Sequence, residues 1–133
     1  MVVKKMENRK IVNEIMEYID QNIDEELSLE HLSKKFHYSK FHLVRLFDKE
    51  QGKTIHQYIK DKRLSRAAEA LSDEVRSITD IAYEAHYNSP QAFTQAFYKV
   101  YECSPRAYRK RKQEMVSMAF YGYYHLQEKG IAA

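Results

Sequence analysis

Residues 78–109 read ITDIAYEAHYNSPQAFTQAFYKVYECSPRAYR, and this stretch decides the fold. Ser89-Pro90 and Ser104-Pro105 each have the order typical of a helix start, a capping hydroxyl followed by proline at the first helical position. Ser77 offers a further capping hydroxyl, and the helix that it opens breaks at His86-Tyr87. The stretch therefore predicts two short helices joined by a tight turn, with a third helix behind them. We expect the second helix to turn four apolar residues inward: Phe93, Ala96, Phe97 and Val100.

The same pattern occurs once more in the first half of the chain. At an offset of 49, Leu29, Leu32, His37 and Tyr38 match Ile78, Ile81, His86 and Tyr87. At an offset of 50, Leu43, Phe47, Lys49, Thr54 and Tyr58 match Phe93, Phe97, Lys99, Ser104 and Tyr108. Matched turns, caps and aromatic residues go beyond the apolar spacing that any helical bundle shares. The sequence predicts two copies of one helix-turn-helix unit.

Apolar residues three and four apart predict further helices around these units. Residues 9–23 place isoleucines four apart, and Ser28, Ser39 and Gly52 supply caps and a stop for the first unit. Thr54 with Gln57 has capping-box spacing and opens a helix that extends to about Leu71. We expect an all-α fold with a first helix-turn-helix subdomain over 1–53, a linking helix over 54–72, a second subdomain over 73–112 and a tail over 113–133. The tail is rich in aromatic residues from Met115 to Leu126. It could be a final helix or strand that caps the core, although its period fits neither element well, or the root of an effector-sensing domain.

The composition excludes several function classes. The 133 residues include three glycines, two prolines and one cysteine, Cys103, so no internal disulfide framework exists. The start MVVKKMENRK has neither a signal-peptide pattern nor a membrane span, and we expect a cytoplasmic protein. The six histidines and Cys103 show no paired ligand spacing, and no glycine-rich phosphate loop or nucleophile elbow occurs. We expect no metal, no cofactor and no enzymatic activity.

The charge of the chain is unevenly distributed. The formal net charge is +3, but residues 1–30 carry −4 and the remaining residues carry +7. A basic excess beyond the first helix is typical of a chain that binds a polyanion such as nucleic acid.

The outward face of residues 40–51 suggests the chemistry of base reading. If Leu43, Leu46 and Phe47 face inward, Phe41, Val44 and Arg45 face outward. An arginine makes a forked contact to guanine O6 and N7, and apolar side chains fit thymine methyl groups. The equivalent face of the second unit carries glutamines that suit adenine, with two methyl-bearing neighbours: Gln91, Ala92, Thr94 and Gln95. This second face has no cation before Lys99, so we expect it to bind more weakly.

Basic residues around the two faces are candidates for phosphate contacts. They are Lys40, His42, Lys49, Lys62, Arg66, Lys99, Arg109 and Lys110.

The chain resembles the DNA-binding domain of the AraC/XylS transcription regulators over roughly residues 10–112. The stretches that carry the resemblance are YSKFHLVRLFDKEQGKTIHQYI from Tyr38, KRLSRAAEAL from Lys62 and the stretch from Ile78 quoted above. The resemblance is strongest to the short multiple-antibiotic-resistance activator type. The resemblance implies two recognition helices that read successive major-groove segments of double-stranded DNA. It also implies that the protein binds DNA as a monomer and activates transcription, with RNA polymerase as a partner. The family's base-reading positions fall on residues of the two outward faces: Phe41, Val44, Arg45, Gln91, Ala92, Thr94 and Gln95.

Three positions depart from the family pattern. His37 and His86 stand where the family usually has glycine in the turns, and Glu102 stands where glycine usually precedes the last Ser-Pro pair. Histidine is among the non-glycine residues that adopt positive φ, so we expect both turns to keep their conformation.

Two alternative functions remain open at this point. A helical module could use the faces around Phe41 and Gln91 to bind a protein, or the chain could be the DNA-binding fragment of a longer effector-controlled regulator.

Overall fold

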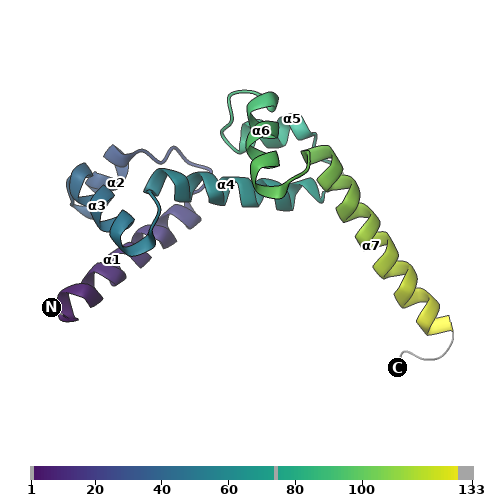
Figure 1. Cartoon of the computed structure of the whole chain (residues 1–133), viewed down its shortest axis with the longest axis horizontal. Helices are drawn as coiled ribbons and strands as arrows, with labels where there is room; N and C mark the ends of the chain where they lie inside the picture. Colours follow the sequence, from purple (N-terminus) through teal and green to yellow (C-terminus); the bar gives the residue numbers. More distant parts are fainter. Residues whose placement is uncertain (1, 74, 129–133) are drawn as a thin grey trace. The chain divides into compact units, whose positions relative to one another are not determined.

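The computed structural model describes residues 2–73 and 75–128, and every regular element among them is an α-helix (Figure 1). The helices are α1 (Val2–Gln21), α2 (Leu29–Phe36), α3 (Lys40–Gln51), α4 (Ile55–Leu71), α5 (Ile78–Glu84), α6 (Pro90–Tyr101) and α7 (Pro105–Glu128). The all-α class is confirmed. Within the described ranges, no helix is both long enough and apolar enough to cross a bilayer.

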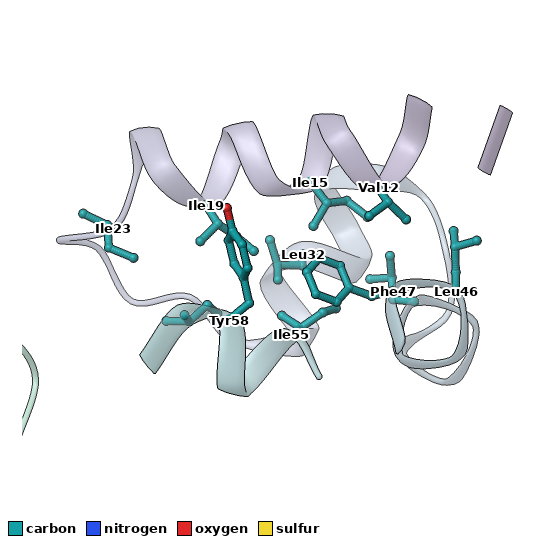
Figure 2. Close-up of a cluster of buried hydrophobic side chains, with 11 residues drawn as sticks. Val12, Ile15, Ile19, Ile23, Leu32, Leu46, Phe47, Ile55 and Tyr58 are labelled. Carbon is teal, nitrogen blue, oxygen red and sulfur yellow. The ribbon is translucent and has the colours of Figure 1, made fainter. Parts of the chain in front are cut away.

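The chain divides into two compact units, Met1–Ser65 and Arg66–Ala133, and the division falls inside α4. In the first unit α3 packs against α1 and α2. Figure 2 shows Val12 and Ile15 pointing from α1 toward Leu32 and Phe47, which form the centre of this core. The start of α4 completes the core with Ile55, Tyr58 and Ile59.

The second unit is built around an aromatic ladder. α6 packs against α5 and α7, with Phe93 and Phe97 fully buried. The Phe97 ring stacks on Tyr101 with ring centroids 4.4 Å apart, and it meets Tyr108 of α7 edge to face at 5.3 Å. Edge-to-face and offset pairs of this kind add to the energy of burial.

The internal repeat is confirmed by the backbone hydrogen bonds of the two units. The Tyr38 N–H donates to the Ser33 carbonyl and the Tyr87 N–H to the Ala82 carbonyl, at the offset of 49. The bonds from Gly52 to Asp48 and from Glu102 to Tyr98 correspond at the offset of 50. Each predicted cap also forms, because a hydroxyl accepts a backbone N–H three residues ahead of it at 3.0–3.1 Å. The capping residues are Ser28, Ser39, Thr54, Ser77, Ser89 and Ser104.

The turns adopt the left-handed conformation that the sequence predicts. His37 has φ 61° and His86 has φ 67°. Gly52 (φ 71°) and Glu102 (φ 58°) end α3 and α6 at equivalent positions of the repeat. Three of these four positions therefore accept a side chain in a region of φ that favours glycine.

Three details differ from the sequence prediction. α1 begins at Val2, seven residues earlier than expected, since residues 2–8 contain no glycine or proline to stop the helix. Val100 was expected to face inward but is 59% exposed, because Tyr101 stacks on Phe97 and takes that place in the core. α7 continues from the second subdomain through the predicted tail to Glu128, so the described part of the tail is helical although its period did not indicate a helix. Residues 129–133 of the predicted tail lie outside the described residues.

Candidate nucleic-acid interface

The outward face of α3 carries a large aromatic ring beside an arginine. Leu43, Leu46 and Phe47 are buried and fix which side of α3 faces outward. Phe41 is 71% exposed, and the guanidinium carbon of Arg45 lies 5.4 Å from the centroid of its ring. The one-turn spacing of the two residues brings the cation over the ring. This contact restricts the guanidinium, and Arg45 remains exposed.

The other predicted residues of α3 are exposed or half-buried. Lys40 and Lys49 lie at the first and last turns of the helix, and Val44 is half-buried beside Arg45. The exposed His42 stacks its ring on Tyr38 with centroids 5.0 Å apart, and its backbone N–H is used by the Ser39 cap. The structure thus places all six predicted residues of α3 on its accessible surface, with the other four around the Phe41–Arg45 pair.

The outward face of α6 is polar and uncharged until its last turn. Gln91 and Gln95 are exposed one helical turn apart, and Ala92 and Thr94 are half-buried between them. Lys99 in the last turn is exposed. Amide side chains at this spacing match the donor and acceptor pattern of adenine, but they attract phosphate much less than a cation does.

The two predicted cations of α4 differ in their surroundings. Lys62 lies 3.8 Å from the Asp20 carboxylate and over the Tyr58 ring at 5.6 Å, so its charge is partly balanced within the first unit. Arg66 is exposed. The Tyr58 hydroxyl donates to Asp20 at 3.0 Å, and burial, with the Asp20 hydrogen bond and charge, raises the pKa of Tyr58 to about 12.

Arg109 has a structural role that corrects our expectation of a phosphate contact. Its guanidinium donates to the carbonyls of Leu71 at 2.8 Å, Asp73 at 3.1 Å and Arg76 at 2.5 Å. These three bonds hold the connection between α4 and α5 and use most of the donors of the side chain. We therefore remove Arg109 from the phosphate-contacting set.

Arg63 plays the same part in the first unit. It donates to the carbonyls of Ile23 at 3.1 Å and Glu25 at 2.8 Å, in the connection between α1 and α2. Burial lowers the pKa of Arg63, and the charge of Asp24 acts in the opposite direction. The two arginines play equivalent parts in the two units. Arg63 of α4 holds the loop before α2, and Arg109 of α7 holds the loop before α5. No local sequence signal separates these two arginines from the exposed ones, since the acceptors lie 33 to 40 residues away.

The start of α7 adds cations that the predicted set omitted. Arg106 and Arg111 are exposed, as is Lys110 in the same part of the helix, and Lys112 lies over the Tyr108 ring at 5.4 Å. The basic run from 109 to 112 was the signal for Arg111 and Lys112, and Arg106 lies outside that run. Within the described residues, no group of three or more His, Cys, Asp or Glu side chains is arranged to hold a metal ion.

Comparison with known protein families and sequences finds one matching family and several relatives of this chain. The helix-turn-helix domain family matches residues 32–111, from within α2 to the first turns of α7. The regulatory protein SoxS of Salmonella typhimurium is 36% identical over 106 residues, which cover 80% of this chain and 99% of SoxS. The transcriptional regulator Rob of the same organism is 36% identical over 108 residues, 81% of this chain. The match covers only 37% of Rob, so the chain spans a little over a third of that relative.

Comparison with solved structures gives the same fold. A transcriptional regulator of Chromobacterium violaceum, described as containing an AraC-type DNA-binding domain, superimposes with a TM-score of 0.73 at 25% identity. The match covers 78% of this chain and 93% of that one.

Proposed function

Because the chain belongs to the AraC-type family of helix-turn-helix regulators, we propose that it regulates transcription by reading double-stranded DNA with α3 and α6. The observation that carries this proposal is the exposed Arg45 guanidinium, held over the Phe41 ring on the outward face of α3. A side chain that is restricted before binding loses less entropy when it forms the forked contact to a guanine.

The two units contribute unequally in this proposal. α3 supplies the stronger base contacts through Phe41, Val44 and Arg45, and α6 reads a neighbouring segment with Gln91, Ala92, Thr94 and Gln95. The phosphate contacts come from cations that surround these faces. They are Lys40, His42, Lys49, Lys99 and Lys110, with smaller parts for Arg66 and for Lys62, whose charge Asp20 partly balances.

Several finer features rest on the family rather than on the geometry. We propose that one chain occupies one site, that α4 connects the two reading units, and that the outcome is activation through RNA polymerase. The protein then needs no cofactor and catalyses no reaction. It works where the DNA lies, which in a bacterium is the cytoplasm.

Binding to duplex DNA at increasing salt tests the proposal. A protein that neutralises several phosphates shows log K falling almost linearly against log salt, by about 0.9 per phosphate. Selection from a random DNA pool should yield a site that competes against unrelated duplex. A flat salt response, or a pool that yields no preferred site, would contradict the proposed function.

A further inference from the structure

The outward side of α3 continues past Arg45 to an aspartate that the proposed function does not use. Phe41, Val44, Arg45 and Asp48 follow one another at intervals of three, one and three residues. Residues at these intervals lie on one side of a helix. Asp48 is exposed, so α3 carries a carboxylate on the side that is proposed to face DNA.

A helix that lies in the major groove presents side chains at this spacing to the bases. The recognition helix of a homeodomain uses four positions, in the order i, i+3, i+4 and i+7, to contact base edges. In α3 the first three of these positions are the residues already assigned to bases, and Asp48 is the fourth. The repeat places Tyr98 at the equivalent position of α6, 50 residues later, where it is 59% exposed. The fourth position is therefore accessible in both units, and it is charged only in the first.

The Asp48 carboxylate is not balanced by a charge of its own unit. Within the part of the chain that the structure describes, no ion pair or hydrogen bond involves this carboxylate. Arg45 lies three residues before it, a spacing that allows an ion pair on a helix, but the Arg45 guanidinium lies over the Phe41 ring instead. The Glu50 carboxylate of the same helix, by contrast, lies 4.0 Å from Nε of Arg9. Arg45 and Asp48 thus each keep their charge available for another partner.

The bases offer such a carboxylate one favourable partner. Duplex DNA carries one negative charge per about 1.7 Å of its axis, so an unpaired carboxylate in the groove lowers affinity unless it meets a donor. The major-groove donors are the N4 amino group of cytosine and the N6 amino group of adenine. Adenine N6 lies between two acceptors, its own N7 and O4 of the paired thymine, whereas cytosine N4 has an acceptor, guanine O6, on one side only. A carboxylate therefore fits cytosine better than adenine.

We propose that Asp48 is a specificity-determining residue that accepts a hydrogen bond from the N4 amino group of a cytosine and disfavours every other base at that position. The assignment rests on the proposed function, because it requires α3 to lie in the major groove. Asp48 is three residues beyond Arg45, which is about 4.5 Å along the helix, and successive base pairs are about 3.4 Å apart. The cytosine therefore lies in the base pair next to the guanine that Arg45 contacts.

Selection of duplex DNA from a random pool with the full chain, Asp48→Asn and Asp48→Ala tests the assignment. For the unmodified chain we expect a cytosine beside the guanine whose preference Arg45→Lys relaxes, and a thymine in its place should lower affinity at least about fivefold. Asp48→Asn should change the preference at this position to adenine, since an amide donates to N7 and accepts from N6. Asp48→Ala should leave less than about a twofold preference there and keep the guanine. Both variants should bind unrelated duplex more tightly, because a charge that repels phosphate is gone.

Glu17→Gln is the matched control for the loss of a negative charge. Glu17 is exposed on α1, and α1 packs against the buried side of α3. This variant should keep the preference for cytosine and change affinity for unrelated duplex by less than about twofold. Far-ultraviolet circular dichroism shows whether each variant remains folded.

The outcomes separate this assignment from the proposed function. A selected site that keeps the guanine but has no cytosine that depends on Asp48 would overturn the assignment alone. The same holds if Asp48→Asn raises affinity for every sequence by one factor, since Asp48 would then only repel phosphate. A pool that yields no preferred site would overturn both the proposed function and the role of Asp48.

Discussion

Arg45 and Phe41 make the sharpest prediction at the scale of single residues. Arg45→Lys keeps the charge but removes the forked donor, so it should lower affinity for the preferred site by about 1–3 kcal/mol and relax preference at one guanine. Binding to unrelated duplex should change little. Competition titrations with the selected site and its single-base variants measure both quantities.

Lys110→Ala is the control for this substitution. Lys110 is exposed at the start of α7 and is proposed to contact phosphate only. It should weaken all sequences alike and reduce the salt slope by about one phosphate. An equal loss on specific and unrelated DNA for Arg45→Lys would show that Arg45 reads no base.

Tyr58 makes a prediction about stability at high pH. Its pKa in the folded chain is about 12, above the ordinary value of 10.0. The folded state therefore favours the protonated hydroxyl, and this stabilisation is complete below pH 10 and is lost as the pH rises from about 10 to 12. Chemical denaturation at successive pH values should show a decline over this window that is smaller in Tyr58→Phe. A phenolate absorbance titration should likewise lose its latest phase in that variant.

At the scale of elements, the left-handed turns are the testable feature. A side chain in this conformation costs about 1–2 kcal/mol, which glycine avoids. His37→Gly and Glu102→Gly should therefore be neutral or stabilising by up to about 1 kcal/mol, while His37→Val should be clearly destabilising. Thermal melting of the variants measures the effect.

Gly52 offers the reciprocal control for Glu102. Gly52→Ala has open space around the new Cβ, so any loss of stability comes from its φ of 71° alone. Equal melting temperatures for the glycine and valine variants at His37 would show that the turn does not restrict φ as the structure indicates.

Elements also show what the sequence could predict and what it could not. Caps and turns depend on residues three to five apart, so Ser39, His37 and Ser104 identified them correctly, and the repeat followed from matching these local signals between the two halves of the chain. Val100 was misjudged because its neighbour Tyr101 stacks on Phe97 and takes the place in the core, a choice that the apolar spacing leaves open. Arg109 was misjudged because its acceptors near Leu71 lie far away in the sequence. Exposure of Arg45 followed from the helical period, but the cation over the Phe41 ring required side-chain geometry.

At the scale of the whole molecule, two binding units on one chain predict an asymmetric site. Once α3 has bound, α6 meets its own segment at a high effective concentration, so the two weak contacts reinforce each other. Five extra base pairs between the two segments turn one segment by about half a helical turn. The insertion should therefore lower affinity to that of the double variant Gln91→Ala/Gln95→Ala on the unmodified site.

The double variant also provides the control for this experiment. On the DNA with the insertion, it should bind no more weakly than the unmodified chain does. A site that tolerates the insertion, or a selected site that is palindromic, would contradict the reading of one site by one chain.

The placement of each core within the sequence has a consequence for how the protein is made. The core of the first unit uses residues between Val12 and Ile59, whereas the aromatic ladder of the second unit is complete only at Tyr108, 49 residues later. Synthesis at about 5–20 residues per second takes roughly 2–10 s for that interval. Small helical units fold in microseconds to milliseconds. The first unit, which carries Arg45, can therefore fold seconds before the unit that carries Gln91 has been synthesised. During this interval the nascent chain has only one of its two proposed DNA-binding units.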